Sequence, residues 1–592
     1  MRRRILGLSI LLLVSGVCPA QTTRREVVVV TGTAEPIPLE EIDRSVDVLP
    51  VANQPTLATA LVDFLRLDPS LDVMARAPGG VQTDVSIRGG SFGQTLVLLN
   101  GQRLSDAQTG HHDMDIPVPL EAVDRIEVLR GSGSTLYGSD AVAGVLNIIT
   151  RQPEATEARV SVAAGNFGVN EERVTLGTVF KKLAEELSFS RDFSSGFMPD
   201  RDYRNLSAAS DTWWRSRLGA SSLMMAYSDK PFGADQFYGN FNSWEDTKTW
   251  FASLVQDLGD RTQAAFSVRR HSDWFVLLRD QPSVYQNHHA DETFDLAIRR
   301  SEPLAANTGL HYGIEGYGDT IESTNLGDHN RSRAAAYVSL DARALGRFSF
   351  SAGVREEMYR WSKGELSPTL AAGAWLAPRW KLHASASRAF RIPTYTDLYY
   401  EDPANFGNPN LKPETAWSFD AGIDWRRSDT FRCSVTVFER RESNDIDYVR
   451  ASTADPWQAT NIARLRFIGV EASATIVPAR GQQITVSYEA LDGAEQALGG
   501  LLSKYVFNYP TQSGVVALHG SYRGVTAQAR LGVVNRLGRP PYALFDVSAG
   551  YGRRRIHPFV RLTNLGDARY QEIAGVPMPG RAAMGGLEWA LR

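Results

Sequence analysis

The sequence has almost no cysteine, and its two cysteines are Cys18 and Cys433. We expect the first to be removed with a signal peptide, so the mature chain would keep a single thiol. A single thiol excludes an intrachain disulfide. Because Cys433 lies in a segment of alternating apolar residues, we expect it to be a small packed or lipid-facing side chain.

The sequence also lacks an excess of charge of one sign and any long apolar run after its first residues. Lys and Arg number 63 against 67 Asp and Glu, for a net charge of −4. A nucleic-acid-binding domain needs a basic face, so no nucleic-acid partner is predicted. No later segment offers the roughly 20 apolar residues that a transmembrane helix needs.

Residues 1–20 have the pattern of a secretory signal peptide. Arg2, Arg3 and Arg4 precede an apolar run, Ile5–Val17, and Cys18-Pro19-Ala20 forms a small-residue cleavage site. This order of segments is typical of export signals. An exported chain without a membrane helix can be periplasmic, secreted, or a closed β-barrel that satisfies its own backbone groups in lipid.

The long C-terminal part, residues 157–592, has the alternation of a membrane barrel. Apolar residues alternate with small or polar ones over 348–354 and 431–437, for example. Such segments, separated by turn-forming clusters, are typical of transmembrane barrels with a polar lumen. About 435 residues allow about 22 strands, and a barrel of that size must be plugged. We also expect a last strand with Leu587, Trp589 and Leu591 on one face.

Residues 39–153 are glycine-punctuated and fit a small α+β plug domain. Apolar spacing of three and four predicts a helix over 57–65, and Asn100-Gly101 predicts a hairpin turn. The other predicted elements are strands at 85–87, 95–99 and 125–129, a short helix at 117–123, and a turn and final strand over 141–150. The predicted fold class is therefore membrane all-β, an antiparallel transmembrane β-barrel of about 22 strands with an N-terminal α+β plug in the lumen.

Three enzyme-like patterns fail on their context. Gly89–Gly93 fits G-x-S-x-G, but a strand follows where the nucleophile elbow needs a helix. Gly133–Gly138 has the spacing of a phosphate loop, but Ser139-Asp140 stands where Lys-Ser/Thr is required. Leu136 occupies the place of the third glycine of a dinucleotide fingerprint. We predict no enzyme, no catalytic residue, no cofactor and no resident metal.

Two histidine pairs could ligate a metal or haem iron, since imidazole and carboxylate suit several cations. They are His111-His112-Asp113 and His288-His289 with Asp291. Adjacent histidines point apart in most conformations, so we favour solvated loop histidines. Ligand contact by the first pair stays open if residues 108–115 form the outer tip of the plug, where Asp113 would favour a cationic or metal-bearing ligand.

A run of aromatic residues spans 232–244 and allows two interpretations. These side chains could form the girdle at a bilayer edge, where Tyr and Trp concentrate. They could also lie in a long outer loop rich in Gly and Asn and stack on a flat ligand. The candidate ligand-binding residues are His111, His112, Asp113, Phe237, Tyr238 and Trp244.

An isolated strand is predicted near the N-terminus, ahead of a Pro-rich linker that ends at residue 38. Its residues are Glu26, Val27, Val28, Val29, Val30 and Thr31. Such a strand can add to the edge of another protein's sheet. The alternative is that it pairs within its own domain.

Several segments together resemble the TonB-dependent outer-membrane receptors. In the plug these are IRGGSFGQTLVLLNGQRL and VDRIEVLRGSGSTLYGSDAVAGVLNIIT, and in the barrel SRAFRIPTYTDLYY, GNPNLKPETAWSFDAGIDW, LTNLGDARYQE and PMPGR. The strand at 26–32 is similar to the family's TonB box. The plug's style is similar to the cobalamin-transporter branch.

The resemblance implies a monomeric transporter in the outer membrane of a Gram-negative bacterium, surrounded by lipid and driven by TonB through residues 21–38. The expected cargo is a scarce metal chelate, cobalamin first and then a ferric siderophore or haem. The alternatives are a non-metal ligand such as an oligosaccharide or peptide, or a passive porin or adhesin. Arg88 and Arg130, each followed by glycine, are candidates for charged contacts between plug and barrel, or else ordinary exposed arginines.

Overall fold

The structure is a computed structural model that describes residues 28–52, 55–359, 363–494, 498–553 and 555–591. The predicted signal peptide and two residues of the predicted TonB box, Glu26 and Val27, lie outside these ranges.

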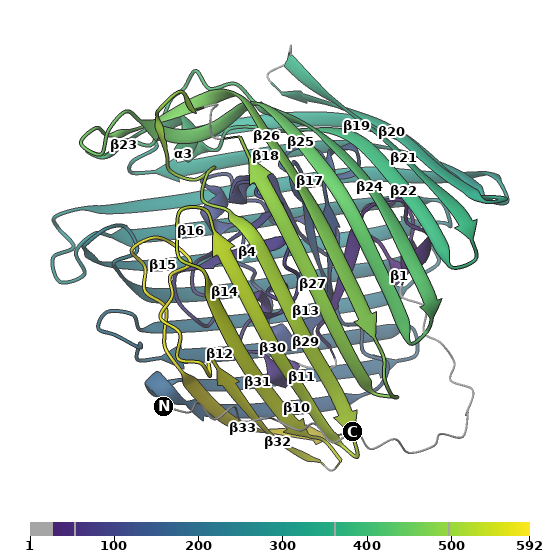
Figure 1. The fold of residues 1–592 in the computed structure, drawn as a ribbon, viewed down its shortest axis with the longest axis horizontal. Coiled ribbons are helices and arrows are strands. Elements are labelled where there is room, and N and C mark those ends of the chain that lie inside the picture. Colours follow the sequence, from purple (N-terminus) through teal and green to yellow (C-terminus); the bar gives the residue numbers. More distant parts are fainter. Residues whose placement is uncertain (1–27, 53–54, 360–362, 495–497, 554, 592) are drawn as a thin grey trace, which may run out of the picture.

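A closed antiparallel barrel begins with the strand at residue 157. The described residues contain 24 barrel strands. Two of them, β23 (Asn405–Phe406) and β28 (Leu502–Ser503), are two-residue pieces in connections. The other 22 strands build the wall, which Figure 1 shows from the side. The first and last of these pair and close the barrel. The wall strands are β10 (Glu157–Gly165), β11 (Asn170–Phe180), β12 (Leu183–Ser194), β13 (Tyr203–Arg215), β14 (Ala220–Asp235), β15 (Asn242–Leu258), β16 (Thr262–Val276), β17 (Gln286–Ala305), β18 (Thr308–Ser323), β19 (His329–Leu345), β20 (Phe348–Tyr359), β21 (Lys363–Ala377), β22 (Trp380–Arg391), β24 (Glu414–Ser428), β25 (Phe431–Arg450), β26 (Trp457–Ile476), β27 (Gln482–Gly493), β29 (Pro510–Tyr522), β30 (Val525–Arg536), β31 (Tyr542–Tyr551), β32 (Ile556–Thr563) and β33 (Ala582–Leu591).

Side chains alternate between the two faces of the wall. On β20, Phe348 and Phe350 are exposed and Ser349 is buried. On β33, Leu587 and Trp589 are 51% and 52% exposed, whereas Glu588 between them is buried. Apolar residues therefore face outward and polar ones face the lumen, which is the arrangement that a lipid-embedded barrel requires.

The plug is a five-stranded mixed sheet with the order β3-β8-β9-β6-β7, and a separate antiparallel pair, β4-β5. Only β6 and β9 run parallel within the described sheet. Its strands are β3 (Val46–Pro50), β4 (Leu71–Ala75), β5 (Thr83–Ile87), β6 (Thr95–Leu99), β7 (Gln102–Arg103), β8 (Val123–Arg130) and β9 (Gly144–Thr150). Asn100 and Gly101 have φ of 51° and 79°, so the predicted hairpin turn joins β6 to β7.

The helices are short. The α-helices are α1 (Leu61–Leu65), α2 (Ser134–Tyr137) and α3 (Tyr395–Tyr399), and the 3₁₀ turns are η1 (Leu39–Glu41), η2 (Pro55–Leu57), η3 (Phe92–Gln94), η4 (Gly110–His112), η5 (Leu120–Ala122) and η6 (Asn166–Gly168). The helix predicted over 57–65 is thus confined to its second half, and the one predicted over 117–123 is a 3₁₀ turn. In the described part of the chain, no helix combines the length and apolar character needed to cross a bilayer.

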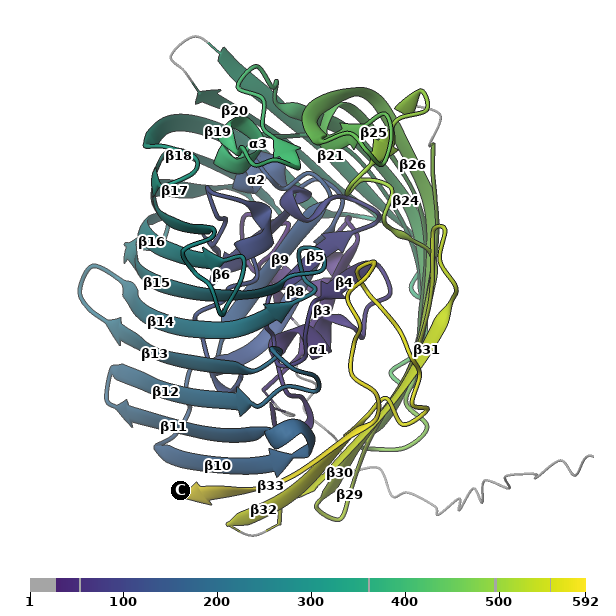
Figure 2. The ribbon, with the colours of Figure 1, turned by 90° about the vertical axis from the view of Figure 1, so that its left-hand side faces the viewer.

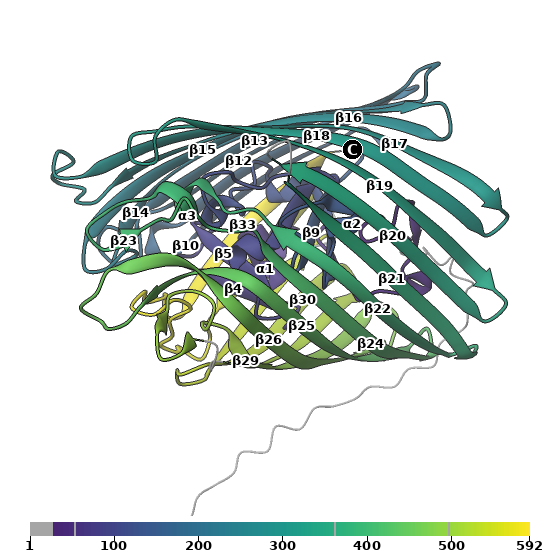
Figure 3. The same ribbon diagram turned by 90° about the horizontal axis from the view of Figure 1, so that it is seen from above.

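The plug lies inside the barrel, as Figures 2 and 3 show from two directions. Its core is apolar, with Phe64, Val97, Ile126 and Leu146 each no more than 2% exposed. The same cluster extends to wall residues of β13–β15, including Phe251. The plug therefore packs directly against the wall on this side.

Candidate functional site

The N-terminal segment pairs within its own domain. β1 (Val28–Val29) lies antiparallel to β2 (Ile37–Pro38), because the chain turns back between them. The backbone amides of Val30 and Thr31 donate to Glu127 Oε2 at 2.9 and 2.8 Å. The expectation of an isolated strand is wrong for these residues, and the alternative of pairing at home describes this state.

Arg88 lies at the interface between plug and barrel. Its Nε donates to Glu471 Oε1 at 2.6 Å and its Nη2 to Glu471 Oε2 at 2.8 Å. Its Nη1 pairs with Asp420, and the guanidinium lies 4.3 Å from the centre of the Phe438 ring. The three partners belong to β24, β25 and β26, so one plug arginine contacts three neighbouring wall strands.

Arg130 differs from the prediction. Its hydrogen-bond partners belong to the plug: Ser70 Oγ at 2.7 Å and the Asp68 carboxylate. The nearest barrel carboxylate, Glu471, is 3.9 Å away. Arg130 therefore holds parts of the plug together, and its contact with the wall is limited to the longer ion pair with Glu471.

Further plug-to-wall ion pairs were not found by sequence reasoning. Arg536 donates to Asp72 Oδ2 at 2.7 Å, and Lys381 lies 2.8 Å from Asp43 Oδ1. Arg66 donates to Glu572 Oε2 at 3.0 Å. The partners are more than 300 residues apart in the chain, and no local pattern joins them.

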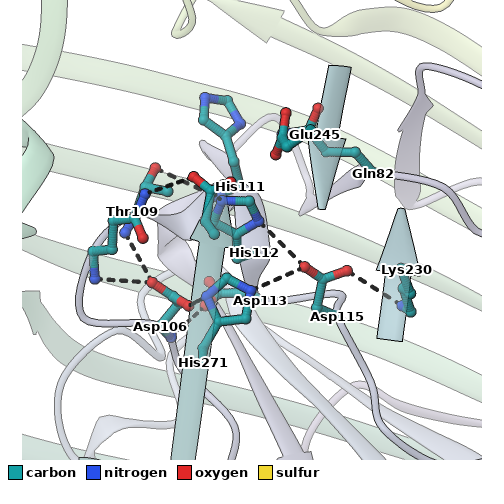
Figure 4. Close-up of polar contacts among 12 residues, drawn as sticks. Gln82, Asp106, Thr109, His111, His112, Asp113, Asp115, Lys230, Glu245 and His271 are labelled. Atoms are coloured by element: carbon teal, nitrogen blue, oxygen red, sulfur yellow. Dashed lines mark hydrogen bonds and ion pairs between the residues drawn. The ribbon is translucent and has the colours of Figure 1, made fainter. Parts of the chain in front are cut away.

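The loop that carries the histidine pair is packed between plug and wall (Figure 4). His111 Nδ1 lies 2.9 Å from Asp84 Oδ1, and its ring stacks on Phe92 with centroids 4.1 Å apart. His112 is 3% exposed, and its Nδ1 lies 3.2 Å from Asp115 Oδ2. The two rings point to different partners as expected, but the prediction that they are solvated is wrong.

The wall supplies the other half of this cluster. His271 on β16 is fully buried, and its Nε2 lies 3.3 Å from Asp115 Oδ2. Its neighbours on the same strand face are Arg269 and Asp273, both buried. Sequence reasoning missed these residues, although polar residues at 269, 271 and 273 have the spacing of one lumen-facing strand side.

Charge in the loop is set by burial and by close partners. Burial works against the charge of the Asp115 carboxylate, but Lys230, 3.2 Å away, and the adjacent imidazoles outweigh it and hold the pKa of that carboxyl well below its usual range. Burial also disfavours the imidazolium of His112, yet hydrogen bonds with Asp115 and Asp273 raise its pKa well above the usual value. Burial raises the pKa of Asp113 well above its usual range.

The predicted aromatic loop is a short connection. Residues 236–241 join β14 to β15, and Phe237 is buried in a cluster with Ala77 and Val81 of the plug. The Tyr238 hydroxyl lies 2.7 Å from Gln82 Oε1. Trp244 is on β15 and packs edge-on against Trp274 at 5.1 Å. The long outer loop was wrongly predicted, and Phe237 and Tyr238 instead contact the plug.

A polar cavity of about 60 Å³ lies beside the histidine loop, between plug and wall. Asp106 and Asp113 line its plug side, and Arg331 and Arg333 its wall side. Ligand pockets usually measure about 300–1,000 Å³. In this state the cavity has room for water and not for a large chelate.

Two family models match the chain. "TonB-dependent Receptor Plug Domain" matches residues 38–145, and "TonB dependent receptor-like, beta-barrel" matches residues 178–566. The second alone covers well over half of the sequence. The boundary between the two matches falls where the plug ends and the wall begins.

Curated relatives and solved structures agree with this division. The chain is 24% identical to the vitamin B12 transporter BtuB of Photobacterium profundum, over 93% of each chain. It is 24% identical to the iron-regulated outer membrane virulence protein of Vibrio cholerae, over 83% of each. Its fold is similar to the siderophore receptor PirA of Acinetobacter baumannii, with a TM-score of 0.78 and 16% identity over 92% of this chain and 98% of that one. The ferric enterobactin receptor PfeA of Pseudomonas aeruginosa has a TM-score of 0.76 and 17% identity, over 95% and 100%.

Proposed function

Because this chain belongs to the TonB-dependent receptor family, we propose that it carries a scarce, large metal chelate across the outer membrane, with cobalamin as the first candidate and a ferric siderophore or haem as the next. The family consists of outer-membrane transporters and receptors, not enzymes. The single observation that carries the proposal is a folded plug inside a closed 22-stranded wall.

A plugged barrel suits the uptake of a large molecule that must be gathered from dilute solution. The plug is held by buried ion pairs such as Arg88 with Glu471. Opening a path for a large ligand requires breaking such contacts, and removing one partner of a buried pair costs about 3–5 kcal/mol. The outer membrane has no ATP supply, so that work has to come from another compartment.

The segment at 26–31 would receive that work by adding as a strand to the edge of TonB's sheet. Main-chain hydrogen bonds supply the grip in this mode of recognition. In the state described here β1 pairs with β2, so β1 must leave β2 before it can pair with TonB. Force on this segment would then reach the plug core through Thr31 and Glu127.

Cobalamin is favoured by the likeness to BtuB along nearly the whole chain. The carboxylates of residues 106–115 would favour a cationic or metal-bearing ligand only once the plug moves, because in this state they are buried against the wall. A non-metal ligand, such as an oligosaccharide or peptide, is the second candidate. A passive porin or adhesin is a poor match, since neither needs a plug that fills the lumen.

A proline substitution tests the TonB mechanism without removing residues. Val28→Pro deletes one backbone donor of β1, while Val28→Ala keeps it. We expect uptake to stop in the first variant and continue in the second, with ligand binding by whole cells unchanged in both. Uptake that persists in Val28→Pro, or after deletion of 26–32, would rule out strand addition at this segment.

The cargo is tested by binding of the purified full chain to cobalamin, haem and a panel of ferric siderophores. His111→Ala alongside the natural sequence asks whether the histidine loop contributes. We expect submicromolar binding of one class of chelate only. Equal weak binding of all of them, with tight binding of an oligosaccharide, would favour the second candidate.

A further inference from the structure

Three side chains from two parts of the fold converge at the histidine loop (Figure 4). His112 and Asp115 come from the plug, next to η4, and His271 comes from β16 of the wall. Their ligand atoms lie within 4.8 Å of one another. We propose that His112 Nδ1, Asp115 Oδ2 and His271 Nε2 form a binding site for a divalent transition-metal ion of the zinc class, which joins the plug to the barrel wall.

The spacing of the donor atoms fits such an ion. Asp115 Oδ2 lies 3.2 Å from His112 Nδ1 and 3.3 Å from His271 Nε2. Zinc bonds of 2.0–2.1 Å in a tetrahedral site place neighbouring ligand atoms about 3.3–3.4 Å apart. Two edges of the tetrahedron are therefore already present, and imidazole with carboxylate is a donor set that zinc prefers.

The outer partners of the two histidines also match a metal site. Metal-ligating histidines usually direct the second ring nitrogen at a carboxylate, which fixes the ring and its tautomer. His271 Nδ1 lies 3.0 Å from Asp106 Oδ2, and His112 Nε2 lies 3.7 Å from Asp273 Oδ2. In each imidazole one ring nitrogen therefore faces a second carboxylate, and the other ring nitrogen faces Asp115.

His271 supplies an independent observation. Its side chain is fully buried, and neither ring nitrogen makes a hydrogen bond of good geometry, although carboxylate oxygens of Asp106 and Asp115 lie 3.0 and 3.3 Å away. Burying a polar group without a hydrogen bond is costly, and native proteins rarely leave such a group without a partner. A metal bound at Nε2 would give one of the two nitrogens a partner.

The charges around the site favour a bound cation. Two basic side chains, Lys230 and Arg269, are buried in this region. Opposite them stand six buried carboxylates: Asp106, Asp113, Asp115, Glu245, Asp273 and Asp291. The carboxylates outnumber the two basic side chains, so a divalent ion held by neutral imidazoles would offset part of the negative charge that remains.

The division of ligands between plug and wall gives the site a mechanical role. Two ligands move with the plug and one stays with β16, so the full set exists only while the plug is seated. Three protein ligands leave a fourth position for water, which is the coordination that catalytic zinc sites also have. Binding would stabilise the seated plug, and displacement of the plug would weaken the hold on the ion.

Metal analysis of the purified, tag-free full chain in detergent tests the site directly. After treatment with a chelator and titration with Zn²⁺, we expect one ion per chain, and Co²⁺ in its place should give the visible bands of a four-coordinate site. His271→Ala and Asp115→Asn should each bind more than about 100-fold more weakly, since even an outer partner is worth 10–100-fold. His383→Ala, which removes a buried lumen histidine on β22 that faces Asp424, should bind as the natural chain does.

Two results would overturn the site. A natural chain that binds no Zn²⁺ or Co²⁺ at micromolar concentration would mean that protonated histidines alone balance the carboxylates. Unchanged binding in both His271→Ala and Asp115→Asn would show that the ion binds at another site. Neither result depends on the proposed uptake function, because metal content is measured without TonB or a chelate.

Discussion

Replacing Arg88 by methionine tests how the plug is held in the barrel. Methionine keeps most of the side-chain volume and removes the charge and all the donors. Arg88 is 3% exposed, and its guanidinium makes two hydrogen bonds to Glu471 and pairs with Asp420. The substitution therefore leaves two wall carboxylates beside an apolar side chain.

The expected cost follows from what remains around the two carboxylates. Removing one partner of a buried ion pair costs about 3–5 kcal/mol. Glu471 still has Arg130 at 3.9 Å, and Asp420 still accepts a hydrogen bond from Ser385 Oγ at 3.0 Å. These remaining partners favour a cost at the lower end of that range. A loss of about 3 kcal/mol raises the population of the displaced plug roughly 150-fold.

Amide hydrogen exchange over residues 83–99 measures that population, because β5 and β6 flank Arg88 in the plug. Exchange through local opening reports the free energy of that opening. Arg88→Met should speed exchange in this segment by about two orders of magnitude and leave exchange in β20 and β21 unchanged. Arg88→Lys keeps the charge but not the paired donors, so its exchange rate should fall between those of the natural chain and Arg88→Met.

A triple variant of the same residues tests whether the cost is electrostatic. If the cost comes from unpaired buried charge, then Arg88→Met combined with Asp420→Asn and Glu471→Gln should restore most of the protection, since the triple variant leaves neither carboxylate charged without its partner. Equal exchange in the single and triple variants would refute an electrostatic origin. Unchanged exchange in Arg88→Met would refute the role of Arg88 in holding the plug.

Three further predictions concern the plug core, plug motion and the lipid face. Gly144→Ala should abolish protection of the plug sheet in hydrogen exchange, because a Cβ there would lie 2.3 Å from a backbone oxygen of β8. The matched control is Gly316→Ala, where a Cβ would have nothing within 4 Å, and this variant should leave the protection of the plug sheet unchanged. Thr135 and Thr369 have hydroxyls 2.7 Å apart, so cysteines at these two positions should form a disulfide between α2 and β21 when the native cysteine is replaced by serine. Uptake should stop on oxidation and recover on reduction. Uptake by the oxidised form would show that α2 stays in place during transport. Leu587 lies on the exposed face of β33. If this position is near the bilayer midplane, Leu587→Lys should destabilise the folded barrel by about 2–4 kcal/mol, measured as a lower unfolding midpoint in denaturant. A change under about 0.5 kcal/mol would place Leu587 near an interface of the bilayer.

Local patterns predicted the barrel and the hairpin well. Alternation over 348–354 is enough to assign the two faces of β20, because lipid and lumen impose opposite demands on successive side chains. The Asn100-Gly101 turn is equally local, since both residues must adopt positive φ. The length of the alternating region also predicted about 22 strands, and the described wall has 22.

The contacts between plug and wall needed the tertiary structure. A plug arginine before glycine was a reasonable candidate at both Arg88 and Arg130, and only Arg88 reaches the wall with hydrogen bonds. The histidine pair gave no sign of its partner on β16, and the aromatic run at 237–238 gave no sign that it covers the plug. These outcomes depend on how one domain is seated inside another.

The sequence by itself predicted an export signal, and it determined the succession of plug and barrel and the lipid-facing side of the strands, because each of these patterns is formed by residues a few positions apart. The tertiary structure alone decided which charged groups meet between plug and wall, from Arg88 with Asp420 to Asp115 with His271. Those pairs join residues more than 150 positions apart, and their energy depends on burial, which exists only when the plug is in place.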